Sequence, residues 1–243
     1  MFSYIRRYNT LSLKKIFFLF VVFIINNRIA FSQIDIGIKV GGNYCNVTSS
    51  NSQQKNSFIV GYHAGAFVRY HFNKFLSLQP EAAYATKGFK YLYHTEYSAS
   101  YWFFSASGST DSHGQYNLSY IDVPLLANAH FGAGGNSYIG LGPQFSFILG
   151  ANWDGETTTT ATIPWQSTQT TTTPNSGSGT QGFNTVDFGA VIGAGTKIGG
   201  DIDCSLRAGY GFSDVSGSSS TNISSGHNLV FSLSVAYLFS IKK

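Results

Sequence analysis

The stretch FIVGYHAGAFVRYHFNKFLSLQPEAAYATKGFKY, from Phe58 to Tyr91, reads as two long strands joined by a turn at Phe72–Phe75. In each arm apolar side chains alternate with polar or small ones, as in a strand whose successive side chains point to opposite faces. Each arm exceeds the about 9–11 residues that a tilted strand needs to cross a bilayer. The apolar face comprises Phe58, Val60, Tyr62, Ala64, Ala66, Val68, Tyr70, Phe72, Leu76, Leu78, Pro80, Ala82 and Tyr84, and the opposite face has Ile59 and Phe67 as exceptions.

The same alternation recurs along the chain and predicts an all-β fold, an eight-stranded antiparallel up-and-down transmembrane β-barrel at residues 33–243. Besides the two strands of the opening stretch, we expect strands at Ile34–Asn46, Tyr116–Phe131, Ser137–Ala151, Phe183–Ile198, Asp201–Phe212 and Asn228–Ile241. Their connections alternate between tight turns rich in Gly and Asn and long loops at Val47–Ser57, Leu92–Gln115, Asn152–Gly182 and Ser213–His227. Short periplasmic turns and long extracellular loops are the plan of bacterial outer-membrane barrels.

The first 32 residues have the features of a cleaved secretory signal peptide. Basic residues precede an apolar run at Ile16–Ile25, and Ala30-Phe31-Ser32 places small residues before a cut at Gln33. The run is shorter than the about 20 residues of a membrane-spanning helix, and an uncleaved anchor is the alternative. The remainder holds ten basic and eleven acidic residues, so the net charge of +4 comes from the leader. The charge therefore gives no reason to expect nucleic-acid binding, and we expect export to the cell outer membrane.

Only 11% of the residues are charged, against about 25% in soluble globular proteins. We therefore expect the apolar face to meet lipid, with aromatic girdles near the strand ends. The main competing fold is a soluble lipocalin-like barrel, which would turn its apolar face inward. The aromatic residues assigned to the lipid-facing surface are Tyr44, Phe58, Tyr70, Phe72, Phe75, Tyr84, Phe89, Tyr138, Tyr237 and Phe239.

The opposite face mixes small residues with isolated charges that would lie inside the barrel. Buried charges require partners, and eight strands leave an interior that side chains just fill. We therefore predict a structural ion-pair network in place of a diffusion pore, in a monomeric barrel. Cys45 and Cys204 fall on opposite faces, so no disulfide is expected. The predicted network comprises Lys39, Arg69, Glu81, Lys87, Asp122, Asp187, Lys197, Asp203 and Arg207.

Two of the long loops are candidate contact surfaces. The loop Leu92–Gln115 is rich in aromatic residues, and exposed aromatic patches often mark contact sites. The alternative is that its YWFF segment extends the strand or folds over the barrel mouth. The segment Gly155–Gly182 has too little apolar content to pack, which predicts a mobile spacer, or else a ligand surface anchored by Trp residues. The candidate contact residues are Tyr97, Tyr101, Trp102, Phe103, Phe104, Trp153 and Trp165.

Three runs resemble the PorT family of Bacteroidota outer-membrane β-barrel proteins. They are SLQPE at Ser77–Glu81 with the Tyr and Lys-Gly that follow, the Tyr-x-x-x-Pro-Leu-Leu pattern within Ser119–Phe131, and the Gly-Pro-Gln of Tyr138–Ala151. The resemblance extends from about Ile34 to the end, with divergent loops. It implies an eight-stranded outer-membrane barrel, in a family with one branch tied to protein secretion and gliding.

The sequence contains no motif that predicts catalysis, a cofactor or a metal site. Glycine-rich segments lie in hairpin turns and lack the G-x-G-x-x-G spacing, and no G-x-S-x-G occurs. We expect a non-enzymatic structural, adhesive or accessory component, with outer-membrane lipid and a protein at the loops or turns as partners. The alternatives are an enzyme at the extracellular mouth, a transporter of a small hydrophobic ligand, and metal binding by His63 and His71. The mouth enzyme would draw on His94, His113, His227, Asp111 and Asp214.

Overall fold

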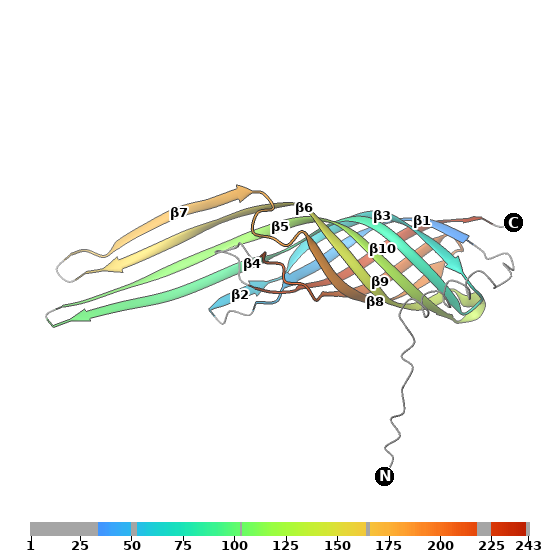
Figure 1. The fold of residues 1–243 in the computed structure, drawn as a ribbon, viewed down its shortest axis with the longest axis horizontal. Helices are drawn as coiled ribbons and strands as arrows, with labels where there is room; N and C mark the ends of the chain where they lie inside the picture. Colours follow the sequence, from blue (N-terminus) through green and yellow to red (C-terminus); the bar gives the residue numbers. More distant parts are fainter. Residues whose placement is uncertain (1–33, 50–52, 103, 164–165, 218–224, 242–243) are drawn as a thin grey trace, which may run out of the picture. The chain divides into compact units, whose positions relative to one another are not determined.

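A computed structural model describes residues 34–49, 53–102, 104–163, 166–217 and 225–241 (Figure 1). Within these residues eight strands form a closed antiparallel ring in the order β1-β3-β4-β5-β6-β8-β9-β10, which β10 closes by pairing with β1. This confirms the predicted fold class. The ring strands are β1 (Ile34–Val47), β3 (Ile59–His71), β4 (Leu76–Tyr101), β5 (Phe104–Phe131), β6 (Ser137–Thr162), β8 (Val186–Ile198), β9 (Ile202–Gly211) and β10 (Asn228–Ile241).

Two further strands extend the sheet beside the ring. Strand β2 (Gln54–Ser57) pairs with β4, and β7 (Gln169–Ser178) pairs with the distal half of β6. The described part of the chain contains no helix with the length and hydropathy of a membrane-spanning segment. The predicted signal peptide, residues 1–32, lies outside the part of the chain that the structure describes.

The predicted loops Leu92–Gln115 and Asn152–Gly182 are largely strands, which corrects the loop assignment. Strands β4 and β5 remain paired as far as Tyr101 and Phe104, and β6 and β7 pair from Asn152–Ser178 to Ala161–Gln169. For Leu92–Gln115 the alternative, that the YWFF segment extends the strand, is confirmed, because β4 ends at Tyr101 and β5 begins at Phe104. For Gly155–Gly182, low apolar content was the wrong criterion. Threonine has high strand propensity, and cross-strand hydroxyl pairs such as Thr158–Thr172 at 3.1 Å add to the backbone ladder.

The tight turns at the opposite end form as predicted. Asn73 Oδ1 accepts hydrogen bonds from the backbone N–H groups of Phe75 and Leu76 at 2.8 and 2.9 Å, which closes the turn between β3 and β4. Gly199 and Gly200 adopt φ values of 64° and 94° between β8 and β9. Glycine adopts positive φ without the steric cost that a Cβ brings, so the sequence at this turn fixes its backbone.

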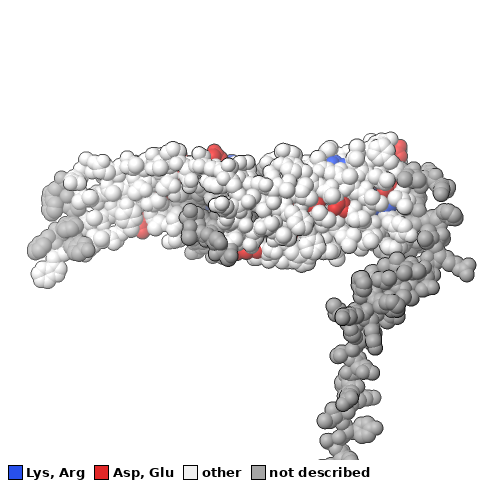
Figure 2. All heavy atoms as spheres, turned by 45° about the horizontal axis from the view of Figure 1, so that its top comes forward, with Lys and Arg blue, Asp and Glu red and all other residues white. Residues whose placement is uncertain are grey.

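Alternation sets which face of each ring strand is exposed. Leu233 is 62% exposed whereas its neighbour Ser234 is 2% exposed, and the surface seen in Figure 2 carries few charged atoms. Phe89 and Tyr138 are 1% and 2% exposed, which corrects their assignment to the lipid-facing surface. Both share the inward parity of their strands, with Lys87 in β4 and Gly140 in β6.

An apolar cluster fills the lumen where the long hairpins begin. Phe89, Leu118 and Tyr120 pack there with Phe183 and Val215 from the segments that connect the later strands. Backbone hydrogen bonds hold these two segments together, since Asn184 N–H donates to the Val215 carbonyl at 3.0 Å. This end of the barrel is therefore packed with side chains.

We predict that Leu233→Arg destabilises the barrel by about 2–4 kcal/mol in lipid, the cost of a charge facing the middle of the bilayer. Leu233 lies in the middle of β10 and faces outward. The measurement is urea unfolding in phospholipid vesicles. Thr172→Arg in the fully exposed β7 is the control and should leave stability unchanged. Equal stability of the two variants would contradict an outward face in contact with lipid.

Candidate functional site

The centre of the lumen is an ion-pair triad built from three strands. Arg207 of β9 donates from Nη1 and Nη2 to the two Glu81 carboxylate oxygens, each at 2.8 Å. Lys39 of β1 forms a second ion pair with Glu81 of β4. All three side chains are at least 92% buried. Glu81 is therefore a carboxylate shared by two cations, and it ties together strands that are not neighbours in the ring.

The triad continues toward the short-turn end through amide and aromatic side chains. Gln79 Nε2 donates to Glu81 Oε1 at 2.6 Å, and Arg69 Nε donates to Gln79 Oε1 at 2.6 Å. Arg69 also pairs with Asp203 at 2.9 Å and lies over the Tyr138 ring at 4.5 Å. The Tyr138 hydroxyl donates to the same Asp203 at 2.8 Å. This explains why Tyr138 points inward: its hydroxyl has a buried partner.

Separate pairs lie on either side of this chain of contacts. Lys87 pairs with Asp122 at 2.7 Å, and Lys197 pairs with Asp35 at 2.6 Å. Asp35 is fully buried and also lies 3.1 Å from His71. Asp35 is absent from the predicted network, although its shared parity with Lys39 in β1 was a usable signal.

Asp187 differs from the other predicted members of the network. It is 5% exposed, and among the described residues it forms no ion pair. Asn228 Nδ2 donates to its Oδ2 at 2.9 Å. Because Glu81 takes two of the lumen cations, one carboxylate is left with a neutral partner. Asp187 lines a cavity of about 60 Å³ together with Lys39, Lys87, Asp122 and Arg207, room for a few waters.

The lumen histidines have neutral or carboxylate partners. His63 lies 2.8 Å from both Asn43 Oδ1 and Ser234 Oγ, and His71 faces Asp35. His63 and His71 thus belong to separate clusters. Within the described ranges, no group of three or more His, Cys, Asp and Glu side chains is arranged to hold a metal ion.

Beyond the ring, the distal parts of β4, β5, β6 and β7 form what we call the extended sheet, residues 91–101, 104–116, 153–162 and 169–177 (Figure 1). Among the predicted contact residues, Trp102 is 96% exposed at the hairpin tip and Tyr97 is 47% exposed. Tyr101 and Phe104 pair across the hairpin, and Phe103 and Trp165 lie outside the described residues. Trp153 belongs to an aromatic cluster at the base of the sheet, 6.2 Å from Tyr116.

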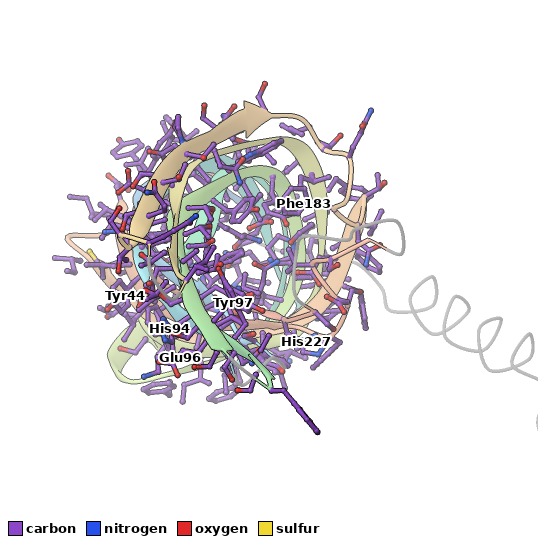
Figure 3. All side chains as sticks on the ribbon, turned by 90° about the vertical axis from the view of Figure 1, so that its left-hand side faces the viewer. Tyr44, His94, Glu96, Tyr97, Phe183 and His227 are labelled. Atoms are coloured by element: carbon purple, nitrogen blue, oxygen red, sulfur yellow. The ribbon has the colours of Figure 1, made fainter. Side chains whose placement is uncertain are left out.

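Histidine–carboxylate pairs lie on one face of the extended sheet. His94 Nδ1 is 2.5 Å from Asp111 Oδ1 and its Nε2 is 3.4 Å from Glu96, while His113 lies 3.1 Å from Glu156. Figure 3 shows Tyr97 on the opposite side of the strand from His94 and Glu96. Both His94 nitrogens face carboxylates, which is unlike a histidine that activates a serine nucleophile.

We predict that Glu81→Ala lowers the free energy of unfolding by about 3–5 kcal/mol, because it leaves two buried cations without their carboxylate. Urea unfolding in vesicles measures this, with Lys90→Ala on the exposed hairpin as control. The combined replacement Lys39→Met, Glu81→Leu and Arg207→Met removes all three charges and should cost less than Glu81→Ala alone. A Glu81→Ala variant as stable as the control would contradict the role of the triad.

We predict that the β4–β5 hairpin loses stability as pH rises. Hydrogen bonds to Asp111 and then Glu96 raise the pKa of His94 above its ordinary value. A raised histidine pKa stabilises the paired state below the unfolded pKa of about 6.5, and this contribution is lost as pH rises through the folded pKa. The protection factors of the amides of residues 94–111 against hydrogen exchange, followed as a function of pH, measure this loss of stability. His94→Asn should flatten the profile, and an unchanged profile in that variant would count against the pair.

The comparisons with known proteins agree with this architecture. A family model described as "Outer membrane protein beta-barrel domain" matches residues 26–217. No curated protein matches the chain.

Solved structures that resemble the chain include three outer-membrane or surface proteins. Ail of Yersinia pestis is 11% identical with a TM-score of 0.39, covering 84% of this chain and 98% of Ail. Neisserial surface protein A is 12% identical with a TM-score of 0.37, covering 84% and 97%. OprG of Pseudomonas aeruginosa is 11% identical with a TM-score of 0.38, covering 86% and 96%. At these values the likeness to solved structures carries no argument about the role of this chain. The family match spans most of the chain, which therefore belongs to the outer membrane protein β-barrel domain family and is an outer-membrane protein.

Proposed function

We propose that this protein is a non-enzymatic outer-membrane anchor that presents the extended sheet as a contact surface outside the cell. The observation that supports this proposal most directly is the length of the strands at one end of the barrel. Strands β4, β5 and β6 have 26, 28 and 26 residues, more than twice the about 9–11 that a bilayer requires. Their distal halves lack the exposed apolar alternation of the ring, so they belong in water, where the exposed Trp102 and Tyr97 are available to a partner.

The lumen argues for an anchor over a transporter of a hydrophobic ligand. Such a transporter needs an apolar path, whereas this lumen contains the Glu81 triad, the Arg69–Asp203 pair and the Lys87–Asp122 pair. The apolar cluster around Phe89 and Leu118 adds a packed layer at the end of the long hairpins. An interior of paired charges and packed side chains stabilises a barrel and leaves no apolar path for a hydrophobic ligand.

The remaining features of the proposal follow from this arrangement. We propose that residues 1–32 direct export of the chain and are then cleaved off. We also propose that the protein acts as a monomer and has its short turns in the periplasm. Kinship with the PorT family of Bacteroidota is also a proposal, supported by the resembling runs. Their residues Gln79, Glu81 and Tyr120 face the lumen, which gives them a structural role in the barrel. A secretion-linked role would place a protein partner at the periplasmic turns.

We predict that trimming the β4–β5 hairpin abolishes partner capture without unfolding the barrel. Replacing residues 94–111 by Asn-Gly joins the paired residues Tyr93 and Ser112 through a two-residue turn that such hairpins favour. The measurement is crosslinking and pull-down from intact outer membranes, followed by identification of the captured partners.

The matched control trims the neighbouring hairpin. Replacing residues 160–170 by Asn-Gly joins the paired residues Thr159 and Thr171 and shortens this hairpin without removing Tyr97 or Trp102. We expect this control to keep the partners that the first variant loses. If the intact chain and the variant lacking residues 94–111 captured the same partners, the proposed contact role would be wrong.

A further inference from the structure

The two faces of the extended sheet differ completely in charge. By strand alternation, one face carries Lys90, His94, Glu96, Asp111, His113, Asp154 and Glu156. The other face continues the lumen-facing side of the barrel and has no charged residue among the described positions. We call it the uncharged face; its members include Tyr91, Tyr93, Thr95, Tyr97, Gly108, Thr110, Ser112, Gly114, Tyr116, Trp153, Gly155, Thr157, Thr159, Thr171, Thr173, Asn175 and Gly177.

Three aromatic rings lie flat on the uncharged face, each over glycine on a neighbouring strand. A Cβ at Gly114 or Gly155 would be 2.8 Å from the Tyr91 hydroxyl. A Cβ at Gly108 would overlap the Tyr97 ring, and one at Gly177 would overlap the Trp153 ring. Gly114, Gly108 and Gly177 are the direct register partners of Tyr91, Tyr97 and Trp153. Gly155 pairs with Gly114 on the next strand along the sheet. The missing side chains therefore let the rings lie along the sheet and present a broad aromatic surface.

Hydroxyl and amide groups fill the space between these rings. Ser112 and Thr157 lie 2.9 Å apart across β5 and β6, and Gln54 and Asn56 of β2 are the register partners of Tyr93 and Tyr91. Thr95 Oγ1 is buried and has no hydrogen-bond partner among the described residues. Hydroxyls donate and accept, and amides supply both donors and acceptors. The face thus combines apolar plates with uncharged hydrogen-bonding groups.

We propose that the uncharged face binds an uncharged oligosaccharide. The C–H groups on the flat side of a sugar ring pack on aromatic plates, while its hydroxyls need neutral donors and acceptors beside them. Tyrosine and tryptophan suit this because they pair an apolar body with a polar end. Tyr91 and Tyr97 are six residues apart on β4, a span of about 20 Å, so the ligand is a chain of sugars. The inference rests on the proposed contact function and names the class of its partner.

The absence of charge decides between glycan classes. A sulfated or uronic-acid polymer needs basic side chains, and the uncharged face has none. A protein partner usually adds charged contacts at the rim of an interface, which the opposite face of the sheet offers and this one does not. An uncharged glycan is therefore the occupant that the chemistry of this face fits best.

The test measures binding of uncharged hexasaccharides, namely the hexamers of cellulose, starch, chitin and mannan, by calorimetry. The full chain is held in nanodiscs, because detergents with sugar head groups would compete. We expect at least one hexamer to bind. Trp153→Ala and Tyr91→Ala should each weaken it about tenfold, the effect of losing one aromatic stack. Trp153→Phe, which keeps a flat ring, should retain most of the affinity.

Leu92→Ala and Asp154→Ala are the matched controls, since each neighbours a test residue in sequence but lies on the charged face. Both should bind as the unaltered chain does. Binding that survives both aromatic variants, or binding of a heparin hexasaccharide alone, would overturn the proposal. If no uncharged hexamer binds while hairpin trimming still removes a protein partner in the pull-down, the glycan assignment fails and the contact function stands.

Discussion

A polypeptide inside a bilayer must pair every backbone N–H and C=O group within the protein, because lipid tails offer no partners. Closure of the sheet by the pairing of β10 with β1 meets this requirement. Once the ring is closed, alternation leaves only two destinations for a side chain, lipid or lumen. Large aliphatic and aromatic residues such as Leu233 and Tyr237 face outward. The charged residues of the ring strands must then share a narrow interior.

That interior explains why the charges come in linked sets. With Asp35 included, the described lumen holds five basic and five acidic side chains, but they do not form five separate pairs. Glu81 serves both Lys39 and Arg207, while Asp187 has Asn228 in place of a cation. Positive and negative charges therefore balance over the lumen as a whole, not pair by pair. Such an arrangement fits the proposed anchor, whose contact surface we place on the extended sheet.

The sequence alone sufficed for the ring because lipid on one side and a polar lumen on the other impose a period of two. It failed where that contrast is missing. In the proposed arrangement both faces of the distal hairpins meet water, which accounts for the lack of polarity alternation in Thr157–Thr160, although they pair as strands. Phe89 and Tyr138 were wrongly assigned to the lipid-facing surface, because aromatic residues occur near strand ends both in the outer girdles and in the lumen. Alternation also predicts which face of the strand Asp187 lies on, but not its neighbours across the lumen. The pairing of glycines with Tyr97 and Trp153 can be recognised only once the strand register is known.

The most direct test of the outward apolar face is the oxygen accessibility of single spin labels placed along β10, residues 231–238, in phospholipid vesicles. Oxygen concentrates in the hydrocarbon core, so labels that face lipid collide with it often. We expect high oxygen accessibility at positions 231, 233, 235 and 237 and low accessibility at positions 232, 234, 236 and 238. Inverted alternation, or equal accessibility at neighbouring positions, would contradict it.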